Sequence, residues 1–409
     1  MKAASSQTLF SGMASSEARR QGILPSQEIR ELIRTGKICS AEDVAEDQIQ
    51  PASIDLRLGR VAYQVEASFL PTRSSTIGAK IRALQLDVID LTGPTLLKRG
   101  NVYIIPLVES LALPRNISGK ANPKSTTGRL DIFTRLMTDG SSEFEQIPDG
   151  YSGDLYVEVV PRTFPIIVRA GTKLNQLRFW RGSPLRDDDY LRSMDRRQKL
   201  VYYENGNGTT QSQEDPKTRV VSAAATIGGG LLLTVNLQDA DRHRVVAYRA
   251  KKKTPAIDLG RVGAYEPSEY WDFITSARSD RLVLQPGDFY LLASKERLGV
   301  PPDHAAEMEQ YDPSLGEFSV HYAGFFDPGF GYGESGEIKG TRAVLEVRAH
   351  EVPILLEDKQ TVGRVNYFRM AGLPEKLYGQ GIGSSYQSQG LSLSKQFKSL
   401  SAVPASCGE

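Results

Sequence analysis

The stretch RGNVYIIPLVESLALP at residues 99–114 returns later in the chain as PGDFYLLASKERLGVP at residues 286–301. The two stretches align without a gap, and Gly100, Tyr103, Leu111 and Pro114 return as Gly287, Tyr290, Leu298 and Pro301. A second pair of segments, residues 154–180 and 342–368, follows with the spacing longer by a single position. A chance similarity would not hold its spacing from residue 99 to residue 180 with one insertion. The chain is therefore predicted to contain two copies of one fold.

Both copies read as mainly β. Their segments are short apolar or alternating runs between turns, such as ASIDLRLG at residues 52–59 and FPIIVRAGTKLNQLRFW at residues 164–180. Many short strands at this spacing are typical of a β-barrel or sandwich. Helical periodicity is scarce, and one helix is predicted over residues 25–37, with Ser26 as its N-cap and Gly36 at its end.

The length of 409 residues suits two domains. We expect a disordered lead-in at residues 1–21, a first domain at 22–180, a linker or arm at 181–218, a second domain at 219–372 and a tail at 373–409. The tail is rich in Gly, Ser and Gln, a composition that suits either disorder or a strap that orders on a ligand.

Composition excludes several classes of partner. With 50 basic and 49 acidic residues the net charge is +1, so no overall field would steer the chain to nucleic acid or a membrane. The two cysteines, Cys39 and Cys407, can build neither a disulfide framework nor a zinc site. No apolar run is long enough to span a bilayer and the first twenty residues lack a signal-peptide core, which together predict a cytoplasmic protein.

A candidate anion site lies in NPKSTTGRLD at residues 122–131. Lys124, Ser125, Thr126 and Arg129 bring two cations and two hydroxyls beside a glycine, a suitable cradle for a phosphate. The alternative is an exposed basic turn. The matching places in the second copy hold Tyr311, Asp312 and Gly316, with further acidic residues nearby, and such a surface would repel a polyphosphate.

The second copy keeps a different feature, HYAGFFDPGFG at residues 321–331. Its Asp-Pro-Gly turn at Asp327 is flanked by phenylalanines, whereas surface turns are usually polar. The first copy keeps Asp139 at the matching place but lacks the proline and the aromatic residues. Each copy thus keeps the half of a site that the other has lost. This predicts one composite site where the two copies meet, within one chain or between chains.

Glu158 lies in the apolar run LYVEVV at residues 155–160. A carboxylate there is costly to bury without a partner, so it either faces outward or acts as a proton acceptor in a dry pocket, paired with Arg129. We expect the second role. Glu346 holds the same position in the copy without the cradle, so we expect it to contribute little.

Common catalytic signatures are missing. The sequence has no His/Cys-x-Glu with Pro-Cys-x-x-Cys pattern of zinc nucleobase deaminases, no phosphate-binding P-loop and no nucleophile elbow. The four histidines have no metal-ligand spacing.

Four stretches together resemble the dCTP deaminase family. KSTTGR followed by GYSGDLYVEVV is similar to that family's basic, hydroxyl and arginine pattern and the strand with its catalytic glutamate. YAGFFDPGFG resembles the nucleoside-binding hairpin that dCTP deaminases share with dUTPases. PASIDLRLG resembles their N-terminal strand motif, and SSYQSQG their nucleotide-covering tail. The resemblance spans residues 22–395 and implies two tandem dUTPase-like distorted β-barrels of the jelly-roll or β-clip type, with few short helices.

The resemblance also implies site roles. Glu158 matches the general base, with Ser125 and Arg129 around it and the catalytic water; Lys124 stands where the family usually has arginine. The expected substrate-binding residues are Lys124, Thr126, Ala323, Asp327, Gly329, Phe330, Tyr386 and Gln389. Of these, Asp327 matches the aspartate that holds the sugar 3′-hydroxyl, and Tyr386 and Gln389 match tail positions near the triphosphate.

The implied reaction is hydrolysis of dCTP to dUTP and ammonia in pyrimidine deoxynucleotide biosynthesis, with Mg²⁺ carried by the triphosphate and no zinc. The alternatives are a dUTP diphosphatase, a bifunctional deaminase and diphosphatase, or a nucleotide sensor without turnover. Because the family places its sites between domains of a three-fold ring, a homo-oligomer is expected.

Overall fold

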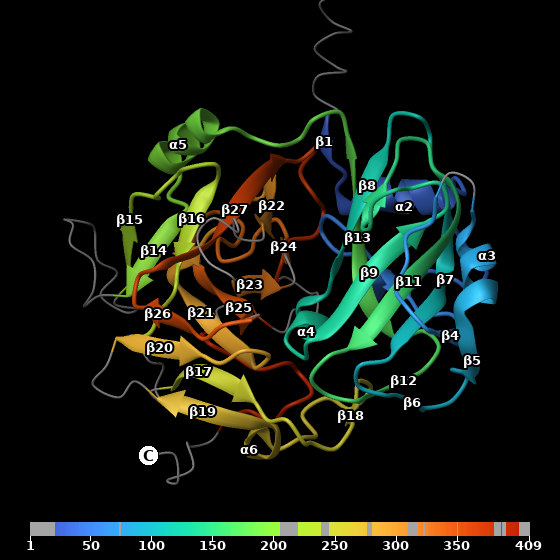
Figure 1. Ribbon diagram of the computed structural model, residues 1–409. Coiled ribbons are helices and arrows are strands. Elements are labelled where there is room, and N and C mark those ends of the chain that lie inside the picture. Colours follow the sequence, from blue (N-terminus) through green and yellow to red (C-terminus); the bar gives the residue numbers. More distant parts are fainter. Residues whose placement is uncertain are drawn as a thin grey trace, which may run out of the picture.

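In the computed structural model two β-rich halves lie side by side, the first copy at the right of Figure 1 and the second at the left. The structure describes residues 21–72, 75–204, 220–238, 245–275, 280–309, 318–321, 324–349, 351–379, 386 and 390–400. None of the helices in these ranges is long and apolar enough to cross a membrane.

The first copy contains two larger sheets. One contains, in order, β1 (Gly22–Ile23), β13 (Lys173–Arg181), β8 (Ser118–Pro123) and β10 (Gln146–Ile147), with β3 (Ile54–Arg57) also on β13. The other contains β5 (Gln85–Asp90), β4 (Val61–Val65), β7 (Val102–Ala112), β11 (Ser152–Pro161) and β9 (Ile132–Thr138), with β2 (Ile38–Ser40) also on β7.

The second copy repeats this plan. Its larger sheet contains β15 (Val220–Ala223), β14 (Val201–Glu204), β21 (Phe289–Leu298), β17 (Val245–Ala250) and β19 (Trp271–Thr275), with β25 (Thr341–Ala349) on β21 and β23 (Phe318–His321) on β25. The smaller sheet contains β16 (Leu231–Thr234), β27 (Thr361–Arg369), β22 (His304–Glu309) and β24 (Phe325–Phe326), and β20 (Arg281–Leu284) pairs with β26 (Ile354–Glu357).

The register of the central strands confirms the repeat. Glu158 on β11 lies opposite Ile104 on β7, and Glu346 on β25 lies opposite Leu291 on β21. The paired strands of the two copies therefore keep the same offsets as the matched segments of the sequence. The predicted mainly β fold in two tandem copies is confirmed.

Helices are few and short: α2 (Ser26–Arg34), the 3₁₀ turn η1 (Glu46–Gln48), α3 (Ile77–Leu84), α4 (Ser125–Gly128), α5 (Asp188–Arg197) and α6 (Pro267–Tyr270). The helix expected over residues 25–37 is α2. Pro25 rather than Ser26 holds its N-cap position, without a side-chain cap, and Ile29 and Leu32 are buried beneath it.

The described part of the expected linker at 181–218 is not a connector. Its helix α5 buries Leu191 and Met194 in the core of the second copy, and β14 pairs with β21. These elements take the places that α2 and β2 have in the first copy. The dense charge on α5 suggested a linker, but an apolar pair three positions apart is enough to anchor one face of a short helix.

The copies are joined by shared strands. β18 (Ile257–Asp258) of the second copy pairs with β12 (Ile166–Val168) of the first, and β12 also pairs with β6 (Thr95–Leu97). An ion pair joins Arg169 to Asp258 at 2.9 Å, and another joins Asp131 to Arg348. One apolar cluster runs through both halves, from Val157 to Leu291. The junction is therefore a packed interface and not a flexible hinge.

Candidate active site

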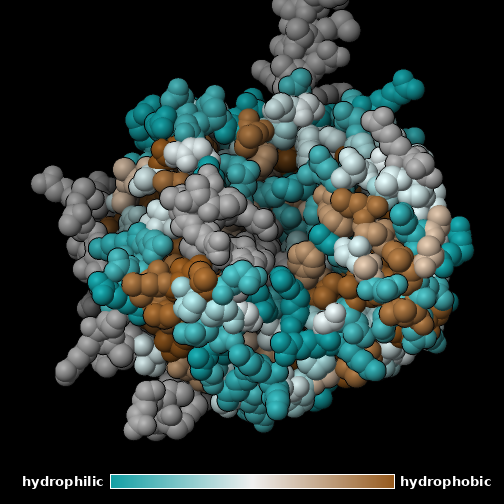
Figure 2. Space-filling model, viewed as in Figure 1, coloured by the Kyte–Doolittle hydropathy of each residue, from teal (hydrophilic) through white to brown (hydrophobic). Residues whose placement is uncertain are grey.

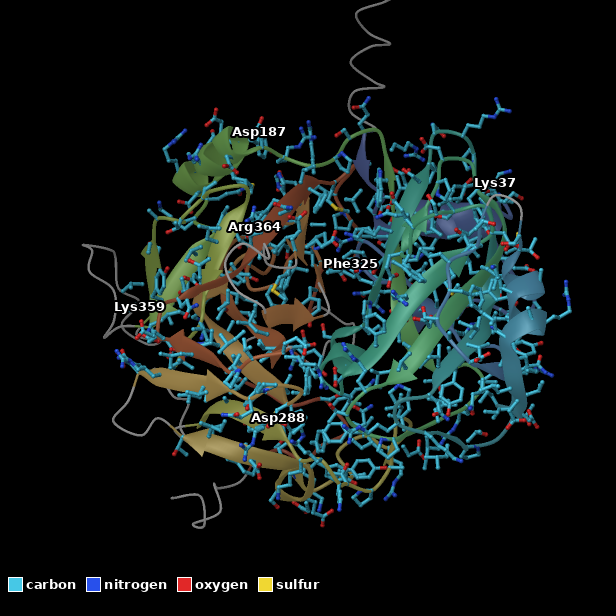
Figure 3. The ribbon with its side chains drawn as sticks, in the orientation of Figure 1. Lys37, Asp187, Asp288, Phe325, Lys359 and Arg364 are labelled. Carbon is cyan, nitrogen blue, oxygen red and sulfur yellow. The ribbon has the colours of Figure 1, made fainter. Side chains whose placement is uncertain are left out.

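A cavity of about 620 Å³ lies where the two copies meet. The surface is hollowed between the halves in the space-filling view (Figure 2), and Phe325 lies in this central region (Figure 3). The walls of the cavity come from the first copy, the second copy and the tail. A cavity of this size suits a small-molecule ligand.

The wall from the first copy is the predicted cradle. Lys124, Ser125, Thr126 and Arg129 all line the cavity. The single helical turn α4 holds them there, because the hydroxyl of Thr127 donates to a backbone carbonyl of the neighbouring strand at 2.9 Å. The cluster is thus a built wall of the cavity, and the alternative of an exposed basic turn is disfavoured.

The wall from the second copy is the predicted hairpin. Asp327, Phe325, Phe326 and Phe330 line the cavity, and the rings of Phe326 and Phe330 lie 4.9 Å apart. Gly329 is close by but does not line it. Its φ is 90°, and a Cβ added there would lie 3.2 Å from the backbone nitrogen of Tyr378, so a side chain at this position would be strained.

The described part of the tail closes over this site. Arg129 donates from Nη1 to the carbonyl of Ser392 at 2.9 Å and to its hydroxyl at 2.8 Å, and the Arg129 guanidinium lies 3.8 Å from the ring centre of Tyr386. Ser394 donates to the carbonyl of Thr126 at 3.1 Å. These contacts hold the described part of the tail against the cradle. Ala323 and Gln389 lie outside the described residues.

Glu158 is not brought to this cavity. Its side chain is fully buried in the first copy, where Oε1 accepts from Nη2 of Arg135 at 2.6 Å and from Nε at 3.0 Å. Arg135 also donates to the hydroxyl of Ser68 and lies 3.5 Å from the ring centre of Phe144. The expected pair of Glu158 with Arg129 is therefore not formed, since Arg135 holds the carboxylate.

Glu346 lines the cavity in its place. It is 5% exposed, and burial raises its pKa from 4.5 to about 8 although the charge of Arg129 acts to lower it. A carboxyl with a pKa near neutrality in a cavity can both take and return a proton. Glu346 was not expected to have this role, because its own copy lacks the cradle.

Among the described residues of the first copy, its own α3 covers the place around Glu158 that matches the cavity. Asp139, the counterpart of Asp327, accepts from the backbone amide of Ile77 at the start of α3 at 2.6 Å. Ile77 and Ile81 of α3 are buried against Met137 and Tyr156, the counterparts of Phe325 and Val344 in the cavity.

The cavity holds further ionisable groups that were not predicted from the sequence. Asp55 forms an ion pair with Lys124, and burial raises the pKa of Asp55. Burial lowers the pKa of Lys395, and it raises that of Asp327, which was predicted. Asp55 lies in PASIDLRLG, so the motif gave a signal. Lys395 gave none, because its place depends on the path of the tail.

Among the described residues, no group of three or more His, Cys, Asp or Glu side chains is arranged to hold a metal ion. The cations that face the cavity are side chains, namely Lys124, Arg129, Arg169, Lys173 and Lys395. Together they give the rim of the cavity a positive charge, which suits a ligand that carries several negative charges.

Comparisons with known proteins agree with this arrangement. A model of the N-terminal domain of 2′-deoxycytidine 5′-triphosphate deaminase matches residues 20–183, and a model of its C-terminal domain matches residues 207–397. The crystal structure of 2′-deoxycytidine 5′-triphosphate deaminase from Agrobacterium tumefaciens is 43% identical in sequence. It has a TM-score of 0.78, and the match covers 87% of this chain and 100% of that one.

Curated relatives match over shorter lengths. A protein of Halobacterium salinarum named "dCTP deaminase, dUMP-forming" is 33% identical over 128 residues, which are 30% of this chain and 60% of that protein. A protein of Parafrankia sp. with the same name is 31% identical over 174 residues, 41% of this chain and 80% of that protein. With both family models matched along its length, the chain belongs to the dCTP deaminase family.

Proposed function

We propose that the protein hydrolyses dCTP to dUTP and ammonia in the cavity between its two copies, with Glu346 as the general base. The observation that supports this most is a buried carboxyl with a raised pKa, Glu346, in one cavity with Arg129 of the cradle and Asp327 of the hairpin. The names of its relatives point to the same substrate.

The chemistry requires one proton acceptor that later becomes a donor. Glu346 takes a proton from water as the water oxygen attacks C4 of cytosine. Glu346 passes this proton to N3, then takes the proton of the new C4 hydroxyl and gives it to the amino group. The C4–N bond breaks, ammonia leaves, and the C4 carbonyl of uracil forms. Arg129, the main charge acting on Glu346, favours its ionised form at the start of the cycle.

Binding would be divided between the copies. Lys124, Thr126 and Arg129 are suited to phosphate oxygens, with Mg²⁺ entering on the triphosphate as part of the substrate and no zinc required. Phe326 and Phe330 form an apolar wall for the nucleoside, and Asp327 is placed to accept from a sugar hydroxyl. Assembly of several chains stays a prediction, since one chain already brings both halves of the cavity together.

The direct test is incubation with dCTP and Mg²⁺, followed by separation of dCTP, dUTP and dUMP. We expect dUTP and one ammonia for each dCTP consumed. Release of dUMP as well would show the bifunctional reaction, which the "dUMP-forming" names of several relatives make the second candidate. In a parallel incubation with dUTP, conversion of dUTP but not of dCTP would show a diphosphatase. Binding of nucleotide without any product would show a sensor.

The raised pKa of Glu346 predicts a pH dependence. The general base must be ionised, and the pKa of Glu346 is about 8. We therefore expect kcat/KM to rise with pH up to about 8 and then level off, falling about tenfold per unit below that value. Rates should be compared above about pH 7, where the terminal phosphate, with a second pKa near 6, is already ionised. A flat profile between about pH 7 and 9 would remove Glu346 from this role.

The covered place around Glu158 predicts one nucleotide bound per chain. Because α3 packs against Asp139 and Arg135 holds Glu158, the first copy offers no second deoxynucleoside pocket among its described residues. Isothermal titration of an inactive Glu346→Gln protein with dCTP and Mg²⁺ would give the stoichiometry. A value of two per chain would show that α3 moves aside.

A further inference from the structure

Arg178 is a fully buried arginine that crosses the junction between the copies. It lies on β13 of the first copy and is 2% exposed, and its guanidinium reaches into the second copy. Its Nη1 donates to the carbonyl of Ala306 at 3.1 Å, and its Nη2 donates to Oδ1 of Asp327 at 3.1 Å. The guanidinium lies 4.0 Å from the ring centre of Phe325.

These contacts fix the guanidinium on three sides. The carbonyl holds one nitrogen, the carboxylate another, and the aromatic ring supports the plane. A charge buried to this extent is costly unless it is paired and hydrogen-bonded. Arg178 does not line the cavity, whereas Asp327 does. Its charge therefore acts on the site through the Asp327 carboxylate.

We propose that Arg178 is a positioning residue that holds Asp327 as an oriented carboxylate, so that its free oxygen accepts a hydrogen bond from the 3′-hydroxyl of the bound deoxynucleotide. This inference rests on the proposed function. It adds that recognition of the sugar, although it occurs at a hairpin of the second copy, depends on a strand of the first.

The charges facing Asp327 leave Arg178 as its main counter-charge. Burial raises the pKa of Asp327, and the charge and hydrogen bond of Arg178 are the largest influences that lower it. Asp55 on β3 raises it and Lys124 before α4 lowers it, but these two groups form an ion pair with each other. Tyr378 also faces Asp327, as a phenol whose own pKa is raised by burial.

Glu307 on β22 does not take Arg178 away from Asp327. It influences Arg178, but its Oε1 accepts from Nζ of Lys120 at 2.5 Å and from Nδ2 of Asn122 at 3.1 Å. Lys120 thus crosses the same junction, and within the described part of the chain it bonds to Glu307 and not to Asp327. It is therefore a matched control.

A comparison of the two copies shows that the arginine and the cavity occur together. The place that matches Arg178 in the second copy is Asn366, and the place that matches Asp327 in the first copy is Asp139. Asp139 accepts instead from the amide of Ile77. The arginine is thus present where the aspartate faces a cavity and is absent from the matching strand of the other copy.

The test compares dCTP with 2′,3′-dideoxy-CTP, which lacks the 3′-hydroxyl. Dissociation constants are measured by titration with Mg²⁺ in a Glu346→Gln background, so that no turnover interferes. With Arg178 present, dCTP should bind more tightly than the dideoxy analogue. Arg178→Met should weaken dCTP roughly 10- to 100-fold, the range for losing a hydrogen bond that involves charge. Binding of dideoxy-CTP should change by less than about threefold.

Three further variants keep the result interpretable. Arg178→Lys should recover part of the preference for dCTP over dideoxy-CTP, and Lys120→Met should leave this preference unchanged. Arg178→Met combined with Asp327→Asn should lose no more of the preference than either change alone. Equal weakening of both nucleotides by Arg178→Met would show a merely structural role and overturn the inference, as would no weakening of either. If the unaltered protein neither binds nor deaminates dCTP, the proposed function itself fails.

Discussion

Replacement of Glu346 by glutamine is expected to lower kcat for dCTP by roughly 10²- to 10⁴-fold, the usual loss when a general base is removed. Glutamine keeps the size of the side chain but cannot take a proton from water. The other walls of the cavity are unchanged, so the dissociation constant for dCTP should stay within about threefold. Release of ammonia and titration with dCTP measure the two quantities. A variant with more than half of the original turnover would contradict the role.

The chain supplies a matched control in Glu158, which has the same strand position in the first copy. Glu158→Gln should leave kcat within about twofold, because its carboxylate contacts Arg135 and not the cavity. Its effect should fall on stability, since Arg135 would lose a buried partner. The reverse outcome, a large loss of activity at Glu158 and none at Glu346, would restore the role expected from the sequence.

Stability separates a catalytic loss from misfolding. The folded-state pKa of Glu346, about 8, lies above its ordinary value of 4.5. The folded state therefore holds the proton of Glu346 more tightly than the unfolded state does. As the pH rises from about 4.5 to 8, the free energy of unfolding falls, because the unfolded chain loses this proton while the folded protein keeps it. Glutamine has no such charge to bury. Glu346→Gln should thus melt no lower than the unaltered protein near pH 8.

The fold could be predicted because the repeat constrains it in physical terms. Gly100 and Gly287 hold matching places in the two copies and both have positive φ, at 81° and 72°. Each lies two residues before a long central strand, and each donates its amide to the carbonyl at the end of another central strand, that of Pro161 and that of Ala349 respectively. Glycine adopts this turn without strain, so its return at the matching place indicates the same turn.

The cradle and the hairpin could also be predicted, because each is a local pattern. The proposed general base differs from the expected one for a physical reason. A site between two copies takes one wall from each, and β25 with Glu346 belongs to the same copy as the hairpin with Asp327. The carboxyl therefore goes with the hairpin and not with the cradle. Sequence similarity to a one-domain pattern favoured Glu158, which has the cradle in its own copy.

The remaining features depend on contacts between distant segments. Arg178 and Asp327 are 149 residues apart in the chain, and Arg129 and Ser392 are 263 apart. No local pattern indicates which buried arginine will meet which carboxylate. The packing of α3 over the region around Glu158 could not be predicted either, because the sequence of an amphipathic helix does not show which residues it will cover.

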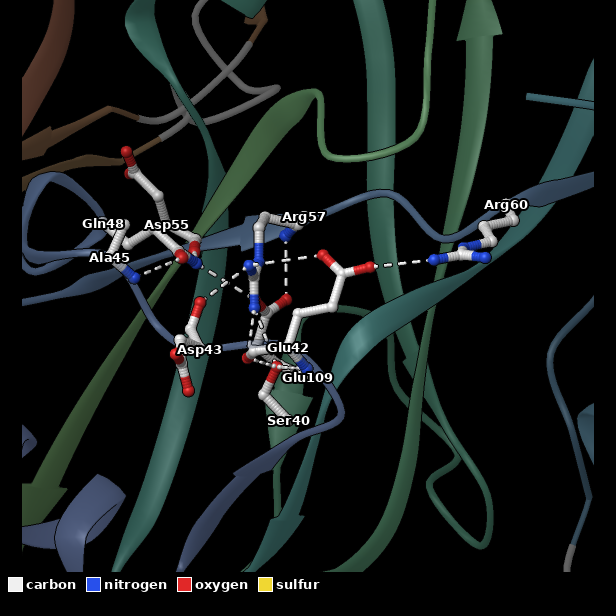
Figure 4. Close-up of polar contacts among 9 residues, drawn as sticks. All are labelled: Ser40, Glu42, Asp43, Ala45, Gln48, Asp55, Arg57, Arg60 and Glu109. Atoms are coloured by element: carbon white, nitrogen blue, oxygen red, sulfur yellow. Dashed lines mark hydrogen bonds and ion pairs between the residues drawn. The ribbon is translucent and has the colours of Figure 1, made fainter. Parts of the chain in front are cut away.

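A second large effect concerns a buried carboxylate that the repeat preserves. Glu109 is 1% exposed, and it accepts from the backbone amide of Arg57 at 2.8 Å, from Nε of Arg57 at 2.7 Å and from Nε2 of Gln48 at 3.0 Å (Figure 4). It thereby ties β7 to β3, the strand that carries Asp55 into the cavity. Its counterpart in the second copy, Glu296, ties β21 to β16 through the backbone amide of Thr234 at 2.8 Å.

The two carboxylates differ in what surrounds them. The three hydrogen bonds that Glu109 accepts from Arg57 and Gln48 all come from N–H donors, one of them on a charged guanidinium. Glu296 also accepts from two hydroxyls, Thr234 Oγ1 at 2.8 Å and Tyr203 Oη at 3.2 Å, and burial raises its pKa. Hydroxyls can donate or accept, whereas an N–H can only donate. A carboxamide can therefore be satisfied at position 296 but not at position 109.

Glu109→Gln is accordingly expected to lower the free energy of unfolding by roughly 3–5 kcal/mol, because its amide would face N–H donors and Arg57 would lose its buried counter-charge. Arg57 would keep only the exposed carboxylate of Glu42, which is 3.8 Å away. Glu296→Gln should cost no more than about 1 kcal/mol, since the new amide can donate to Thr234 or Tyr203. Urea unfolding of both variants, followed by far-UV circular dichroism at one pH, measures the difference. Equal losses would mean that burial of the carboxylate decides the cost in both copies, and that the nature of its partners does not.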